Sequence, residues 1–370
     1  MLNLAPDEVV FKQVIAGSFK ATNQVNGWVQ ALIQSSIVNT IPPQDCITSI
    51  QTSFSQCVTS LESSWVEDLM PKLKSDIPQA FVSFSETFGP IAENIGNIMG
   101  SLPSDTGNPT AQQKQTLQGL VTDLQQSVNQ NITTLQSLMQ KSKNVISQIK
   151  SFYTTVTQGA QSAQQVLKVD AKDILNLQNQ IAALQQKLSD DEAKLDPDQD
   201  DFLSGMGDML YNFTFGLALN TMKGEPEVSL GDVFTSALEI GESVATIDAD
   251  TSAVEDDVQN LATLEDQLSA EELAVAALYG TVNTVKKLAG FSNGLLASLP
   301  MVLGLWTTLG DACGQLLEIF QQPAVNLCMV SMLENISTTT RTWNNISQYA
   351  DSVLDVSVTP NQVSLNNTGN

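Results

Sequence analysis

The sequence predicts a mainly α-helical protein: an elongated multi-helix bundle with two very long antiparallel helices and a small apolar head at one end. Two long stretches place apolar residues seven positions apart, and a short uncharged segment, 211–220, lies between them. A folded core is expected, because 42% of the 370 residues are hydrophobic. We expect 1–196 and 247–358 to form the bundle, 202–246 to form the head, and 359–370 to be a flexible tail.

The chain before the long repeats predicts two helices. Residues 7–38 carry a broad apolar face, and Asp7 suits the first turn of a helix. A second helical run begins at about Asp45. We expect three prolines to interrupt or kink this run: Pro71, Pro78 and Pro90. A loop is expected at 100–110, which is rich in Gly, Pro, Ser and Asp.

The two heptad stretches, 110–196 and 247–320, predict the long helices, and a last helix is expected at about 323–356. The first stretch contains one four-residue stutter near Ser142, and a helix of about 86 residues would be about 130 Å long. Its main repeat comprises Ile146, Tyr153, Ala160, Leu167, Ile174, Ile181, Leu188 and Leu195. The second repeat comprises Ile247, Val254, Leu261, Leu268, Val275 and Val282. The simplest geometry is an antiparallel hairpin with the insert at one tip.

The insert, 202–246, has three interpretations. Apolar residues alternate over 211–219, the turn-forming sequence KGEP follows at 223–226, and these features predict a small β-hairpin. As a helix, 202–222 would be about 30 Å long, close to the thickness of a bilayer core. A capping element packed on the bundle end is a third interpretation. Exposed apolar surface of this kind favours an interface or a membrane contact.

A second apolar stretch, 288–310, carries no charge. Its length would allow a transmembrane helix. We favour a helix buried on all sides in the bundle, because the other helices need an apolar partner to pack around.

The composition excludes several classes of function. The chain has no histidine, which removes the usual general base and zinc ligand, so we expect no enzyme activity, no metal and no cofactor. The formal net charge of −24 repels phosphate groups, so we expect no nucleic-acid partner. No convergent polar motif indicates a small-molecule substrate. The acidic run at 190–201 lacks calcium-loop spacing and predicts a solvated helix end.

Four cysteines allow two disulfides or leave free thiols: Cys46, Cys57, Cys313 and Cys328. If Cys46 and Cys57 share one unbroken helix, they lie about 16 Å apart, too far to bond. Bridges between N-terminal and C-terminal helices, and buried free thiols, are the alternatives. The first residues lack the basic region and apolar run of a signal peptide, so the signal is absent from this sequence, export is unconventional, or the protein stays inside the cell.

This layout of N-terminal helices, a long heptad helix, an apolar insert, a second long helix and a closing helix resembles the ClyA-like α-helical pore-forming toxins. That family includes cytolysin A, the components of haemolysin BL and the non-haemolytic enterotoxin, the tripartite Gram-negative haemolysins and single-domain helical insecticidal toxins. The resemblance covers nearly the whole chain. It implies a secreted, soluble protein that converts to a membrane-inserted oligomer. Its implied partners are the target-cell membrane, further copies of the chain, and related toxin components.

The resemblance also implies which part of the chain enters the bilayer, namely the apolar residues of the head. They are Met206, Met209, Leu210, Tyr211, Phe213, Phe215, Leu217, Leu219, Met222, Val228, Leu230, Val233 and Phe234. The alternative function is a non-lytic coiled-coil tether whose apolar tip docks a protein partner. An enzyme on a helical scaffold is the weakest hypothesis.

Overall fold

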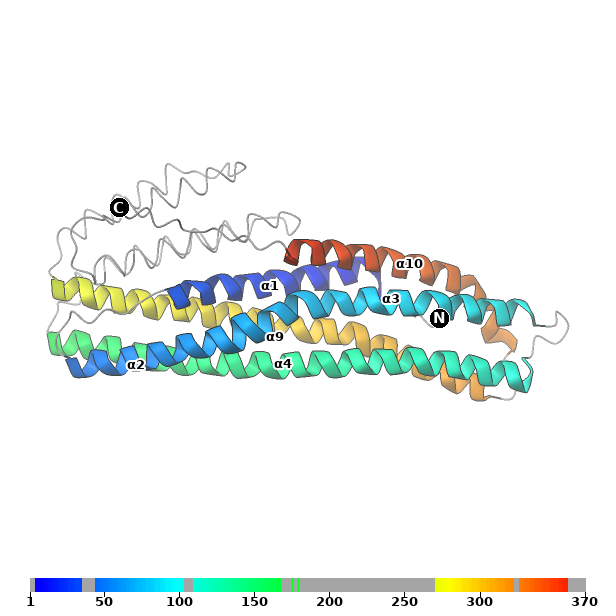
Figure 1. The fold of residues 1–370 in the computed structure, drawn as a ribbon, viewed down its shortest axis with the longest axis horizontal. Helices are drawn as coiled ribbons and strands as arrows, with labels where there is room; N and C mark the ends of the chain where they lie inside the picture. The colour runs from blue at the N-terminus through cyan, green and yellow to red at the C-terminus, as the bar shows by residue number, and fades with distance from the viewer. Residues whose placement is uncertain are drawn as a thin grey trace, which may run out of the picture. The chain divides into compact units, whose positions relative to one another are not determined.

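The computed structural model describes residues 4–34, 44–102, 109–167, 175, 179, 270–322 and 326–358. Every regular element in these ranges is a helix (Figure 1). The helices are α1 (Glu8–Gln34), α2 (Gln44–Leu61), the π-helix η1 (Glu62–Leu69), α3 (Met70–Gly100), α4 (Ala111–Leu167), α9 (Ala270–Gln321) and α10 (Asn326–Val358). The predicted mainly helical class is confirmed.

The chain divides into two compact units. The first unit contains Met1–Phe19, Pro71–Lys141 and Leu296–Asn370, and the second contains Lys20–Met70 and Ser142–Leu295. One boundary in α4 falls at Ser142, where the heptad pattern has its stutter. The Ser142 side chain is fully buried, which is unusual for a polar residue.

Side-chain caps begin two of the helices. The Asp7 carboxylate accepts hydrogen bonds of 3.0 Å from the backbone N–H groups of Val9 and Val10, so Asp7 is the N-cap of α1. Thr110 and Gln113 form a capping box at the start of α4. The Gln113 N–H donates to Thr110 Oγ1 at 3.2 Å, and the Thr110 N–H donates to Gln113 Oε1 at 2.9 Å. These caps fix the predicted starts near residues 7 and 110.

Within the first unit, α4 and α9 run antiparallel (Figure 1). Lys114 Nζ donates to the carbonyl of Gln322 at 2.8 Å, while further along α4, Val128 lies against Gly310. As residue numbers rise on α4, the numbers of their partners fall on α9. A Cβ on Gly310 would lie only 3.3 Å from Val128 Cγ1, so glycine permits this close approach of the two helices.

The second unit repeats the antiparallel pairing with other side chains. Lys150 Nζ donates to Asn293 Oδ1 at 3.2 Å, and Tyr279 Oη donates to Gln164 Oε1 at 2.7 Å. The predicted antiparallel arrangement of the long helices is therefore present in each unit. The parts of the predicted long helices at 168–196 and 247–269 lie largely outside the described residues, as does the whole head at 202–246.

α2 also packs against α4 in the second unit. Phe54 contacts Phe152 with ring centroids 5.8 Å apart, and Ser60 Oγ donates to Gln148 Oε1 at 2.8 Å. Ile50 contacts Gly159 so closely that any Cβ at residue 159 would overlap its side chain. Only glycine fits there without a shift of the Ile50 side chain.

The prolines at 78 and 90 do not interrupt the second helical run, because α3 continues through both. Pro78 is itself buried, and α3 buries a long apolar face that includes Phe81, Phe84 and Phe88. That packing outweighs the backbone hydrogen bond that a proline removes. The irregular segment precedes α3 instead: η1 ends with the Met70 N–H bonded to the carbonyl of Trp65, five residues back.

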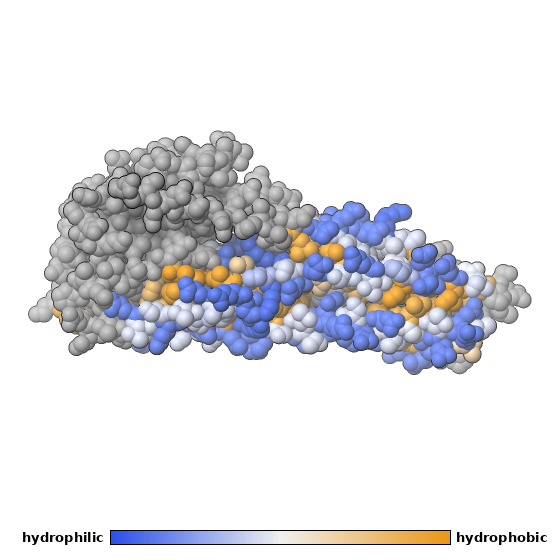
Figure 2. All heavy atoms as spheres, in the orientation of Figure 1, coloured by the Kyte–Doolittle hydropathy of each residue, from blue (hydrophilic) through white to orange (hydrophobic). Residues whose placement is uncertain are grey.

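Threonine hydroxyl groups on the helices donate hydrogen bonds to backbone carbonyls of their own helix. Thr122 Oγ1 donates to the carbonyl of Gln118 at 2.7 Å, and Thr157 Oγ1 donates to that of Tyr153 at 2.7 Å. Figure 2 shows that hydrophilic residues cover much of the described surface on the face drawn there, with hydrophobic residues between them.

Candidate functional site

The predicted membrane-inserting residues, from Met206 to Phe234, all lie outside the described residues. Their assignment therefore stays a prediction. The described chain offers three other features of functional interest: the apolar helix α9, an aromatic cluster in the first unit, and a pocket beside that cluster.

In the part of the chain that the structure describes, one helix is long and apolar enough to cross a membrane by length and composition, and it spans Thr281–Gln321 of α9. The same test is met by core helices of soluble proteins. One face of α9 is buried, with Leu299 and Val302 inaccessible to solvent, while Met301 is 57% exposed. The expectation of a helix buried on all sides is therefore wrong, because only one face of α9 packs against neighbouring helices.

Seven aromatic side chains from α1, α3, α9 and α10 form a cluster in the first unit. They are Phe11, Phe81, Phe84, Phe88, Trp306, Trp343 and Tyr349. Phe81 stacks on Trp306 with centroids 4.4 Å apart, and Phe84 contacts both Trp306 and Trp343, at 5.4 Å and 4.7 Å. Such pairs add stability beyond the area that they bury. The cluster is the core where these four helices meet.

Polar contacts join α1 to α10 at the edge of this cluster. The buried Trp343 Nε1–H donates to the carbonyl of Leu4 at 2.8 Å, and the Trp343 carbonyl accepts from Ser85 Oγ at 3.1 Å. Two residues further along α10, Asn345 Nδ2 donates to Glu8 Oε2 at 2.9 Å. Residues with higher numbers on α1 contact residues with higher numbers on α10, as Glu8 contacts Asn345 and Phe11 contacts Tyr349. The helices α1 and α10 are therefore parallel.

Glu8 is the charged residue of this contact. The hydrogen bond from Asn345 lowers the pKa of the Glu8 carboxyl, and Lys12, whose Nζ lies 2.9 Å from Glu8 Oε1, lowers it further. Both partners favour the ionised form. Lys12 Nζ also lies 5.6 Å from the centre of the Tyr349 ring, so its charge contacts both helices.

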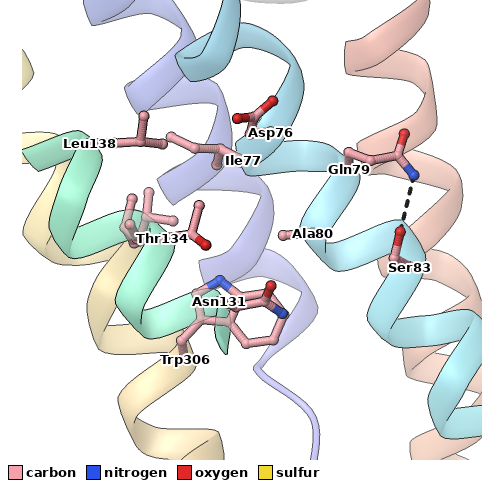
Figure 3. Close-up of a pocket in the computed structure, with 11 residues that line it drawn as sticks. Asp76, Ile77, Gln79, Ala80, Ser83, Asn131, Thr134, Leu138 and Trp306 are labelled. Atoms are coloured by element: carbon pink, nitrogen blue, oxygen red, sulfur yellow. Dashed lines mark hydrogen bonds between the residues drawn. The ribbon is translucent and has the colours of Figure 1, made fainter. Parts of the chain in front are cut away.

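A pocket of about 280 Å³ lies between α3 and α4, with α9 behind it (Figure 3). Its apolar lining includes Ile77, Leu135, Leu138 and Val302, and the indole of Trp306 forms part of its inner wall. Polar side chains line the rest, among them Asp76, Gln79, Ser83, Asn131 and Thr134. Gln79 Nε2 donates to Ser83 Oγ at 3.2 Å along the α3 side.

Two of the cysteines are free, buried thiols, Cys57 on α2 and Cys313 on α9. Burial raises the pKa of the Cys57 thiol from 9.0 to about 12 and that of Cys313 to about 11. Cys46 and Cys57 lie on the same continuous helix, which places them too far apart to bond. The side chains of Cys46 and Cys328 lie outside the described residues. In the same described ranges, no group of three or more Cys, Asp or Glu residues is placed to hold a metal ion.

The aromatic cluster and the pocket were not predicted from the sequence. Phe81, Trp306 and Trp343 are far apart along the chain, and periodicity shows that a residue faces a core without showing which helix it meets. The one available signal was that α9 combines an uncharged face with a tryptophan at a buried seam position.

The fold defines a class: proteins in which long antiparallel helices are packed by shorter N-terminal and C-terminal helices. A family model, Bacillus haemolytic enterotoxin (HBL), matches residues 43–191. No curated protein sequence matches the chain.

Solved structures of toxins share the fold over nearly the whole chain. Motility Associated Killing Factor B from Vibrio cholerae is 14% identical with a TM-score of 0.69, over 95% of this chain and 93% of that one. The HblL1 toxin component of Bacillus cereus is 14% identical with a TM-score of 0.55, over 95% and 98%. Soluble SmhB of the tripartite α-pore-forming toxin Smh from Serratia marcescens is 10% identical with a TM-score of 0.57, over 94% and 98%. The predicted resemblance to these helical toxins is confirmed at the level of the fold.

Proposed function

We propose that the protein is a pore-forming toxin or one component of a multi-component pore-forming toxin. The observation that carries the proposal is the fold likeness over about 95% of the chain to toxin components from separate organisms. The match of residues 43–191 to the haemolytic enterotoxin family supports it independently. The partners we propose are a target-cell membrane, further copies of this chain and related toxin components, with a secreted, soluble form preceding the membrane-bound one.

The membrane-contacting element that we propose is the apolar head, with Tyr211, Phe213 and Phe215 at its centre. Burial of each large apolar side chain in lipid is worth about 1.5–3 kcal/mol. Several such residues together offset a local rearrangement. Because a bilayer core leaves no backbone group without a partner, the inserted form must be a helix or a closed barrel. One short segment cannot line a pore alone, so several protomers must assemble.

The experiment is dye release from neutral liposomes by the purified chain, alone and together with the proteins encoded by adjacent genes. Leakage supports the proposal. No leakage in any combination, together with a stable complex with another protein, would favour the tethering function instead.

The head assignment is tested with Phe213→Asp and Phe215→Asp, which should abolish leakage while leaving the far-UV circular dichroism of the soluble protein unchanged. Val166→Asp is the matched control, because Val166 lies on α4 and is 52% exposed in the soluble structure. Unchanged leakage by the head variants would refute the site. Equal loss in the control would show that the effect is not specific to the head.

A further inference from the structure

The indole N–H of Trp306 has no hydrogen-bond partner among the described residues, although the side chain is only 2% exposed. Two other deeply buried tryptophans are paired: Trp65 Nε1 donates to Asn26 Oδ1 at 3.2 Å, and Trp343 Nε1 donates to the carbonyl of Leu4 at 2.8 Å. A buried donor without an acceptor is destabilising and rare in folded proteins. The Trp306 N–H therefore needs an explanation.

The unpartnered group lies at the pocket between α3 and α4. Trp306 is one of the lining residues, and its nitrogen-bearing edge faces the side chains of Asn131 and Thr134 (Figure 3). Neither the Asn131 amide nor the Thr134 hydroxyl makes a side-chain hydrogen bond within the described residues. Three polar groups from two helices are thus available on one side of the same pocket.

The volume of the pocket argues against a single water as its natural occupant. On the measure used for the pocket, a single water needs only about 10–15 Å³, whereas the pocket measures about 280 Å³. Its apolar wall of Ile77, Leu135 and Leu138 also offers a water nothing to bond. A molecule with an apolar body and one acceptor fits both halves of the lining.

The charge of the lining restricts the ligand further. Asp76, which is exposed, is the only ionisable residue of the lining, and no Lys or Arg lines the pocket. An anionic ligand would meet this carboxylate and a chain of net charge −24.

We propose that this pocket binds a small uncharged molecule whose carbonyl, or other acceptor oxygen, accepts a hydrogen bond from Trp306 Nε1. The apolar body of the ligand packs against Ile77, Leu135 and Leu138. Asn131 and Thr134 are placed to bond the same polar end of the molecule. The site is formed within the first unit, and its test needs no toxin activity.

The experiment is a titration with cyclohexanone, which has an apolar ring and a single carbonyl acceptor, monitored by the indole N–H signals of ¹⁵N-tryptophan-labelled full-length protein. The Trp306 signal, assigned by its loss in Trp306→Phe, should shift in a saturable way. A ligand of this size is expected to bind with a Kd of about 1 mM. No shift, or a linear shift of all four indole signals, would overturn the proposal.

Two variants test the geometry. Trp306→Phe keeps an aromatic ring but removes the donor, and should weaken cyclohexanone binding roughly tenfold, as expected for one lost hydrogen bond to a buried group. Binding in this variant is followed by ligand-detected saturation transfer. Ala80→Leu fills the pocket from α3 and should abolish the Trp306 shift. Unchanged affinity in either variant would refute the assigned contacts.

A second pocket-filling variant and an anionic probe complete the experiment. If Ala80→Leu does not fold, Thr134→Leu narrows the pocket from α4 at an exposed position and should have the same effect. Cyclohexanecarboxylate, the anionic counterpart of the probe, should bind at least tenfold more weakly because of Asp76. Equal binding of the anion would overturn the proposed ligand class.

Discussion

Replacing Trp343 with phenylalanine tests whether the contact between α1 and α10 stabilises the first unit. The Trp343 side chain is 1% exposed, and Leu4, whose carbonyl accepts its hydrogen bond at 2.8 Å, is 8% exposed. Phenylalanine keeps most of the ring contacts with Phe84 and Phe88 but leaves the Leu4 carbonyl buried without this donor. An orphaned buried acceptor costs about 1–3 kcal/mol. The smaller ring adds a cavity term.

Trp306→Phe is the matched control for that cavity term. Trp306 is 2% exposed and packs in the same cluster, but its N–H bonds to no described residue. We expect Trp343→Phe to lower the free energy of unfolding by about 1–3 kcal/mol more than Trp306→Phe. Both residues belong to the first unit. Urea unfolding followed by near-UV circular dichroism therefore reports the unfolding of the same unit in the two variants. Hydrogen exchange at the first turn of α1 should quicken in Trp343→Phe alone. Equal losses in the two variants would refute the reasoning.

Three further outcomes are expected. Gly159→Ala should destabilise the second unit by about 1–3 kcal/mol, because its Cβ would overlap Cγ1 and Cδ1 of Ile50, and Ile50→Ala, which removes both atoms, should relieve the overlap in the double variant when its urea unfolding is compared with that of Ile50→Ala alone. Gly119→Ala, also on α4 but with nothing within 4 Å, should stabilise by about 0.5–1 kcal/mol; a loss there would contradict the overlap argument. Cys57 and Cys313 should react with a thiol reagent at pH 8 far more slowly in the native than in the urea-unfolded protein, since the pKa values are raised to about 12 and 11; equal rates would show that the thiols are accessible. Between pH 9 and about 12 the unfolded state loses the Cys57 proton, whereas the native state keeps it. The stability that the protonated Cys57 thiol contributes is therefore complete below pH 9 and falls as the pH rises to about 12. A free energy of unfolding in which this contribution grew over the same range would contradict the burial of Cys57.

Much of the helical pattern was predictable, because period and caps are local. Asp7 and Thr110 mark helix starts through side-chain bonds to nearby backbone, and the predicted last helix at about 323–356 is α10, Asn326–Val358. Pro71, Pro78 and Pro90 were predicted to interrupt or kink the helical run, and the interruption was wrong at Pro78 and Pro90, because a rule about one residue cannot weigh the apolar face that the whole helix buries.

The contacts between helices were not predictable in the same way. Nothing near Trp343 indicates that its indole donates to Leu4, and nothing near Gly159 indicates that Ile50 lies on it. Such pairs depend on the rotation of each helix about its axis, which one sequence does not specify. The pocket is a further case, because it exists where α3, α4 and α9 fail to fill the space between them.

The pairing of α1 with α10 has a consequence for how the chain is made. Leu4 and Trp343 are 339 residues apart, and Glu8 and Asn345 are 337 apart. Loop-closure entropy must be overcome before contacts of such separation form, and this slows folding. During synthesis the segment from Leu4 to Lys12 leaves the ribosome well before its partners on α10, which lie 337 and 339 residues later in the chain. These contacts of the first unit therefore form only after α10 has been translated, and until then the segment from Leu4 to Lys12 lacks its α10 partners.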